Sequence, residues 1–227
     1  MKKIMGYLKK LLEKNKLQKK DDIYSDYDKA KRHFDNGVSA TGLSKFKENQ
    51  SAVKYFDNVI NSLLKDDIPL EIISLTAFHS GDERNISFTL VDLFHLRGCA
   101  KFNISDDSSI EDFTEAIKIS KKYEDAYYMR GTAYFILLED WQKAIVDINK
   151  YLTFSPDDKS GNQLLLVLDE IKQNADKINK LYNKALDDYS KGEKMLSNED
   201  EKNFNEKKEN KLFMSSMKSL DKAYELF

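Results

Sequence analysis

Two side chains with reactive chemistry, His95 and Cys99, stand four residues apart in the sequence. On a helix this spacing brings an imidazole and a thiol onto one face, where they can touch. A nucleophilic thiolate would also need an orienting group, and a zinc site would need two more soft ligands. The other histidines, His33 and His79, lie in unrelated segments, and Cys99 is the single cysteine. We therefore expect neither catalysis nor a metal here, and interpret Cys99 as a packing residue beside Gly98.

Adjacent carboxylates are frequent, but they fall at expected helix starts, loops and exposed faces, where Asp caps amides and complements the helix dipole. The stretch PDDKSGN resembles a calcium loop, yet Pro156 stands where the first ligand should be. Motifs typical of phosphate-binding loops, zinc proteases and serine hydrolases do not occur. The sequence therefore predicts a protein that is not an enzyme and uses no cofactor and no metal.

Composition favours an all-α fold. The chain has 227 residues, of which 41% are hydrophobic, so it can bury a core. Its 37 basic and 39 acidic residues nearly cancel to a formal charge of -2, which argues against nucleic acid as a partner. Two prolines and eight glycines leave few breaks and indicate long helices. With one cysteine and no apolar run of about 20 residues, we expect a cytoplasmic protein without a transmembrane helix.

Apolar residues recur at helical spacing along most of the chain, and this pattern sets the expected elements. A loop is expected at residues 79–84. The expected helices cover residues 24–46, 51–65, 68–78, 85–103, 110–117, 124–138, 140–154, 160–171, 176–196 and 208–227.

Residues 1–20 are expected to form a basic amphipathic helix, because they carry eight lysines against one acidic residue, Glu13. Such a helix can cap the domain or dock on an acidic partner. Contact with an anionic membrane is the less favoured alternative.

Residues 126–158 resemble one unit of the tetratricopeptide repeat (TPR), whose pattern is W-x2-L-G-x2-Y, then A-x3-F, then P. A glycine in this pattern lets the facing helix approach closely. The turn around Glu139 is one residue longer than in the family. The matching positions hold Tyr127, Arg130, Gly131, Tyr134, Ala144, Ile148 and Pro156.

A weaker copy precedes it, so that the resemblance extends over residues 92–158. Gly98 and Gly131 stand 33 residues apart, each directly after an arginine, Arg97 or Arg130. We expect these arginines to form structural pairs between neighbouring helices. Residues 21–227 are then a single TPR-like domain, with clear repeats at 90–123 and 124–158 and divergent hairpins at 24–66 and 176–227. The resemblance implies a right-handed superhelical stack of helical hairpins.

In this family the opening helices line a concave groove, and the resemblance places ten residues there. Aromatic anchors and two acidic side chains would favour a basic or apolar peptide. The alternative is that terminal helices cover this face and the aromatics are core. The basic clamp that holds chaperone tails is absent, because His95, Cys99, Tyr128 and Thr132 occupy its positions. The predicted groove consists of Asp92, His95, Cys99, Phe102, Asn103, Asp125, Tyr128, Thr132, Phe135 and Ile136.

The predicted function is a non-enzymatic protein-protein interaction module, a scaffold or adaptor that binds a peptide or protein segment in this groove. Two alternatives stay open. One is a self-assembling structural protein whose groove is filled by its own helices. The other is a peripheral membrane adaptor that uses residues 1–20.

Overall fold

The structure, a computed structural model, describes residues 22–65, 73–79, 82–197 and 206–224. The expected basic helix over residues 1–20 lies outside these ranges. The chain forms two compact units, residues 1–162 and 163–227. We had expected one domain from residue 21 onward. Each unit is described by itself.

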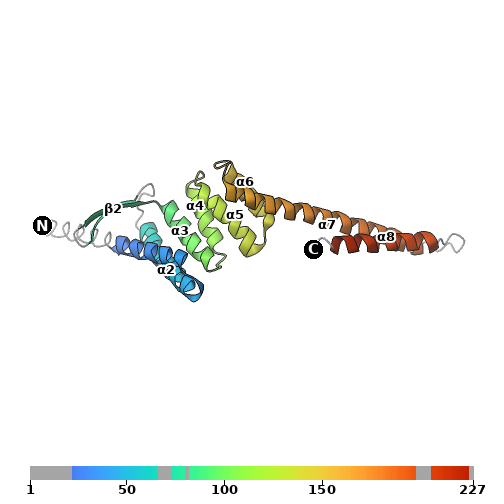
Figure 1. The fold of residues 1–227 in the computed structure, drawn as a ribbon, viewed down its shortest axis with the longest axis horizontal. Coiled ribbons are helices and arrows are strands. Elements are labelled where there is room, and N and C mark those ends of the chain that lie inside the picture. Colours follow the sequence, from blue (N-terminus) through green and yellow to red (C-terminus); the bar gives the residue numbers. More distant parts are fainter. Residues whose placement is uncertain (1–21, 66–72, 80–81, 198–205, 225–227) are drawn as a thin grey trace, which may run out of the picture. The chain divides into compact units, whose positions relative to one another are not determined.

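Helical hairpins build most of the first unit, and the expected TPR-like helical fold is confirmed apart from one pair of strands (Figure 1). The first hairpin joins a helix over residues 22–39 to α2 (Gly42–Lys65). Its turn lies at residues 40–41, earlier than the break we expected between 46 and 51. The following helices are α3 (Leu90–Asn103), α4 (Ser109–Ile119), α5 (Glu124–Leu138) and α6 (Trp141–Leu152).

One element departs from the helical pattern. The predicted helix over 68–78 is wrong where the structure describes it, because β1 (Ile73–His79) and β2 (Asp82–Phe88) form an antiparallel hairpin. Its register pairs Ile73 with Phe88 and His79 with Asp82. A short run that contains apolar and β-branched residues can form a helix or a strand, and in this protein it forms a strand. The helix expected from residue 85 therefore begins only at Leu90, where Thr89 and Asp92 form a capping box.

Glycines set the close approach of the helices within each hairpin. A Cβ atom on Gly98 would lie 2.7 Å from Cε1 of Phe113, and one on Gly131 would lie 3.0 Å from Cδ1 of Ile148. This confirms the reason given for the glycine of the repeat. The first hairpin does the same, since a Cβ atom on Gly37 would lie 2.4 Å from the amide nitrogen of Asn49. In each of these three hairpins a glycine allows the two helices to approach closely.

The extra residue in the α5–α6 turn has a visible structural role. Glu139 adopts the left-handed conformation, with φ of 52°, directly after α5. The amide of Asp140 then donates to the carbonyl of Tyr134. The side chain of Asp140 accepts a hydrogen bond from the amide of Lys143 at 3.0 Å and so caps α6.

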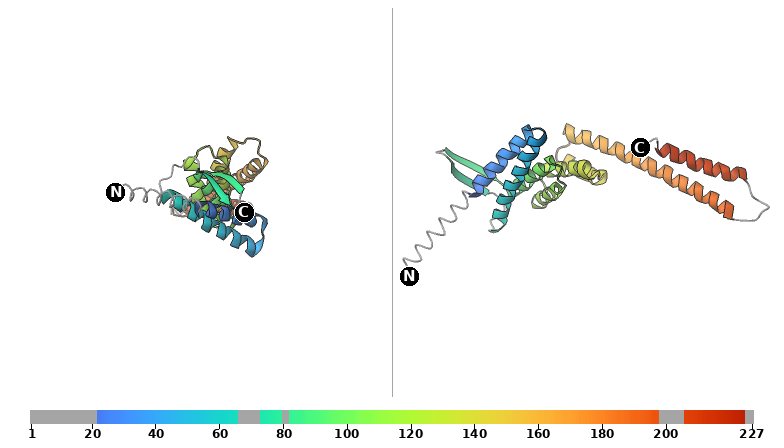
Figure 2. Two further views of the ribbon diagram at one scale, coloured as in Figure 1. Left: turned by 90° about the vertical axis from the view of Figure 1, so that its left-hand side faces the viewer. Right: turned by 90° about the horizontal axis from the view of Figure 1, so that it is seen from below.

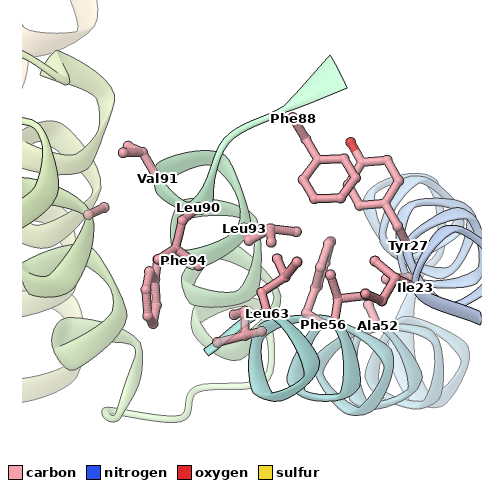
Figure 3. Close-up of a cluster of buried hydrophobic side chains, with 14 of the residues drawn as sticks. Ile23, Tyr27, Ala52, Phe56, Leu63, Phe88, Leu90, Val91, Leu93 and Phe94 are labelled. Atoms are coloured by element: carbon pink, nitrogen blue, oxygen red, sulfur yellow. The ribbon is translucent and has the colours of Figure 1, made fainter. Parts of the chain in front are cut away.

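A hydrophobic core joins the 22–39 helix, α2 and α3 (Figure 3). Phe56 and Leu93 are fully buried. The ring of Phe88, at the end of β2, stacks on Tyr27 with 4.2 Å between ring centroids. This core fixes α3, which carries half of the predicted groove.

Two antiparallel helices make up most of the second unit, α7 (Lys159–Ser197) and α8 (Glu206–Tyr224). They lie side by side in each of the lateral views (Figures 1 and 2). We had expected separate helices over 160–171 and 176–196, but α7 is continuous for 39 residues. Neither glycine nor proline stands between residues 162 and 191, so nothing in the sequence ends the helix there.

Candidate functional site

The α3 side of the predicted groove centres on His95 and Cys99. Their Nε2 and Sγ atoms lie 3.5 Å apart, as the four-residue spacing predicts. Tyr123 directly precedes α5. Its ring packs against that of His95, with 5.3 Å between the ring centroids. The Tyr123 hydroxyl donates to Oδ1 of Asp92 at 3.3 Å. The structure therefore brings Asp92, His95 and Cys99 together and adds Tyr123, which we had not predicted.

The electrostatics of this cluster oppose nucleophilic chemistry. Burial, with a smaller effect from Asp125, raises the pKa of Cys99 to about 12. Burial also lowers the pKa of His95, although Asp125 and Asp92 act in the opposite direction. At neutral pH the pair is a thiol beside a neutral imidazole. A reactive cysteine has the reverse, a lowered pKa beside a cation.

Further along α3, Phe102 and Asn103 are half-buried. The amide of Asn103 donates to Oδ1 of Asn49 at 3.1 Å, across to α2. Asn49 is fully buried and its own amide donates to the carbonyl of Lys45 at 2.8 Å. Asn103 therefore links α3 to α2. We had predicted a contact between Asn103 and a ligand, and not this link between helices.

The α5 side carries the other five predicted residues, with graded exposure. Asp125 and Ile136 are exposed, whereas Tyr128, Thr132 and Phe135 are half-buried. The Thr132 hydroxyl donates to the carbonyl of Tyr128 at 2.8 Å, so it is occupied within its own helix. The residues of this side that remain accessible to a ligand are therefore Asp125, Tyr128, Phe135 and Ile136.

A neighbouring aromatic residue flanks this side. The Tyr128 ring lies 5.0 Å from that of Tyr151, on α6. Burial and nearby Asp158 raise the pKa of Tyr151, so its hydroxyl stays protonated at neutral pH. Tyr151 is an addition to the predicted set.

Arg97 forms structural pairs, as predicted. Its Nε atom lies 2.9 Å from Oδ2 of buried Asp112 on α4, and its Nη1 atom lies 2.7 Å from Oδ1 of Asp57 on α2. Lys101 adds a contact of 3.0 Å to Asp112. The Asp112 carboxylate therefore pairs with both Arg97 and Lys101, and Arg97 links α2, α3 and α4.

Arg130 repeats this arrangement one unit later. Its Nε and Nη2 atoms lie 2.7 and 2.8 Å from the two oxygens of Asp147 on α6. Its Nη1 atom donates to the hydroxyl of Thr114 on α4 at 3.1 Å. In both units the arginine precedes the contact glycine, and the aspartate precedes the side chain that packs on it.

One hollow on the first unit lies apart from the predicted groove. It has a volume of about 380 Å³, and none of the ten predicted residues lines it. Its walls are Arg130, Tyr134, Gln142, Lys143, Val146 and Asp147. We call the surface formed by the predicted residues of α3 and α5 the α3–α5 face.

Two searches of the described residues gave negative results. No group of three or more His, Cys, Asp or Glu side chains in these ranges could hold a metal ion. No described helix is long and apolar enough to cross a membrane.

Several solved structures are similar to this chain at low sequence identity. No protein-family model and no curated protein matches the sequence. The TPR domain of Arabidopsis OM64 is similar at 19% identity and a TM-score of 0.42, covering 63% of this chain and 96% of that one. The second TPR domain of human RPAP3, in complex with an HSP70 peptide, has 19% identity and a TM-score of 0.44, covering 65% and 98%. A crystal structure of MamA has 16% identity and a TM-score of 0.48, covering 96% and 86%. Because each TM-score lies below 0.5, the TPR-like description depends on the hairpins of this chain itself.

Proposed function

We propose that this chain is a non-enzymatic protein-protein interaction module that holds a peptide or protein segment against the α3–α5 face. The observation that carries the proposal is the position of two carboxylates, Asp92 and Asp125, on that face beside His95 and Tyr123. Burial dominates the pKa values of His95 and Tyr123, yet at both groups Asp92 and Asp125 push the pKa upward. Asp125 does the same to Cys99. His95 and Tyr123 thus lie close enough to both carboxylates to feel their charge, and Cys99 lies close enough to that of Asp125.

The chemistry of the face favours a basic or apolar ligand. Exposed Asp125 can attract a lysine or arginine, while half-exposed Tyr128 and Phe135 and exposed Ile136 can bury apolar groups. Aromatic side chains supply much of the binding energy in protein interfaces, and charges at the rim guide encounter.

An acidic chaperone tail fits this face poorly. The RPAP3 domain is in complex with an HSP70 peptide that ends in Glu-Glu-Val-Asp. The resemblance to the repeat family places His95, Cys99, Tyr128 and Thr132 where that family's basic clamp stands, and the neighbouring Asp92 and Asp125 would repel such a tail. We therefore propose a ligand of the opposite charge.

The test is affinity capture with the intact protein and a Tyr128→Ala, Phe135→Ala double variant. The control is Ile119→Ala, Val146→Ala, which removes exposed apolar side chains elsewhere on the first unit. We expect the control to keep its partners and the double variant to lose them. If both variants capture the same partners as the intact protein, the α3–α5 face is not the binding surface. Circular dichroism verifies that each variant is folded.

A second variant tests the charge of the ligand. Asp125→Asn should weaken capture and reduce its dependence on salt, because one attractive charge is gone. Unchanged salt dependence would contradict a basic ligand while leaving an apolar one.

A further inference from the structure

Small side chains line the contact between α7 and α8 in the second unit. The Ser216 hydroxyl donates to the carbonyl of Ala185 at 3.0 Å, and that of Ser215 donates to Oδ2 of Asp188 at 2.7 Å. A Cβ atom on Gly192 would lie 3.0 Å from Cζ of Phe213. The two helices therefore approach closely, and there is little room between them for large apolar side chains. The buried residues of this seam are Ala185, Asp188, Gly192, Ser216, Ser219 and Ala223.

The large apolar side chains lie beside the seam and are exposed. Leu186 and Tyr189 each follow a seam residue of α7 by one position, and on α8 Met217, Leu220 and Tyr224 do the same. One position is a rotation of about 100° around a helix. Because the helices are antiparallel, the same rotation carries both stripes to one side of the hairpin.

Contacts across the hairpin fix the register of this side. The rings of Tyr189 and Phe213 meet edge to face, with centroids 5.6 Å apart. One turn away, Leu186 lies level with Met217. We call this surface the apolar face, and it consists of Tyr182, Leu186, Tyr189, Phe213, Met217, Leu220 and Tyr224.

The spacing along each helix is that of a packed bundle. The α7 members stand four and three residues apart, and the α8 members four, three and four. Such alternation is typical of helices that pack knobs into holes. Lys184 and Lys191 on α7 and Lys222 on α8 fall on the opposite side at 100° per residue. No charged residue is a member of the apolar face, and the charges beside it, Glu193 and Asp221, stand at its border, as at the rim of a protein interface.

The area suits a second copy of this chain. Six members of the apolar face are between 44% and 83% exposed. A free side chain of this size presents on the order of 200 Å², so together they offer roughly 600 Å². Flanking Met214, which is also exposed, extends this toward the ~800 Å² that each partner contributes to a standard interface.

We propose that the apolar face is a homodimerisation surface, on which two copies of the chain pack α7–α8 against α7–α8 as a four-helix bundle. Both helices of one copy present the same kind of stripe, so a two-fold axis matches the face with itself. The proposal is independent of ligand binding by the first unit.

The test is the mass of the full-length protein in solution, measured by sedimentation equilibrium from about 1 to 100 µM, a range that covers typical weak dimers. We expect twice the chain mass of 26.4 kDa at the upper end. A Leu186→Glu, Met217→Glu double variant places like charges within the paired faces and should raise the dissociation constant by at least about 100-fold. The control Lys184→Glu, Lys222→Glu changes the opposite side and should remain dimeric.

A second measurement tests the proposal even if the Leu186→Glu, Met217→Glu variant fails to fold. Leu186→Cys in the otherwise intact chain should form a disulfide-linked dimer under mild oxidation, because Leu186 stands in the middle of the α7 stripe, where a two-fold axis through the face brings equivalent residues close together. Native Cys99 is half-buried beside His95 and its thiol has a raised pKa, so the intact chain should cross-link far less. An intact protein that is monomeric at 100 µM, or a charged double variant that stays dimeric, would overturn the proposal. A Tyr128→Ala, Phe135→Ala variant that loses partners yet remains a dimer would separate the two proposals.

Discussion

Removing the negative charge of Asp147 should loosen the α5–α6 hairpin. Its side chain is 5% exposed and that of Arg130 is 17% exposed, and two hydrogen bonds of 2.7 and 2.8 Å join them. Breaking a buried ion pair by removing one partner costs about 3–5 kcal/mol, because the remaining charge stays desolvated. In Asp147→Asn one oxygen still accepts a bond from the guanidinium. We therefore expect a loss of about 2–3 kcal/mol in the free energy of unfolding.

The single tryptophan, Trp141, is the first residue of α6 and reports on this hairpin. Urea unfolding followed by its fluorescence gives the change in free energy. The control is Glu115→Gln, which breaks the exposed ion pair between Glu115 and Lys118 in the same unit and should change stability by less than about 0.5 kcal/mol.

A further variant separates a stranded charge from the loss of the pair itself. Arg130→Met, Asp147→Leu removes both charges and should recover most of the stability that Asp147→Asn loses. If Asp147→Asn is as mild as Glu115→Gln, the Arg130–Asp147 pair does not hold the two helices together.

Two further predictions concern α3. Gly98→Ala should lower stability by about 1 kcal/mol, because overpacking against the buried Phe113 ring costs about 1–3 kcal/mol and the gain in helix propensity returns about 1. Adding Phe113→Leu should restore part of the loss in thermal unfolding, and a Gly98→Ala protein that is more stable than the parent would contradict the contact. Because burial lowers the pKa of His95 below its usual 6.5, the unfolded chain binds a proton more readily, so stability is complete above pH 6.5 and falls as the pH drops toward the folded pKa. Urea unfolding between pH 7.5 and 5.5 should show this loss, at most about 1.4 kcal/mol per pH unit, and His95→Gln should lack it; parallel curves for both proteins would refute a buried neutral imidazole.

The helical hairpins could be predicted because each leaves a local mark in the sequence. Around Gly98 and Gly131 the pattern of arginine, glycine and apolar residues reflects helix–helix contacts between residues at most about 17 positions apart in the sequence. The β1–β2 hairpin escaped prediction because a short segment such as ISLTAFH, in which apolar and polar residues are mixed, can form a strand or a helix. The continuity of α7 was missed because polar residues near Asp176 suggested a break that no glycine or proline enforces.

The candidate site was predictable in part. The contact between His95 and Cys99 follows from their spacing on one helix. Asn103 is different, since its partner Asn49 lies 54 residues away and no local pattern links them. Tyr123 lies outside the helices, where the periodicity of the repeat gives no position to its side chain. Which residues of a face are covered depends on such distant neighbours.

The glycine contacts also mark where the chain can be lengthened. The residue that packs on the glycine follows it by 12 positions at Gly37, 15 at Gly98 and 17 at Gly131. The turns themselves are unequal, at residues 40–41, 104–108 and 139–140, yet a glycine contact is present in each of these three hairpins. Hairpin register is anchored at the helix crossing and not by the number of residues in the turn. The exposed turn at Glu139 is consequently a natural insertion point for an epitope or a small domain.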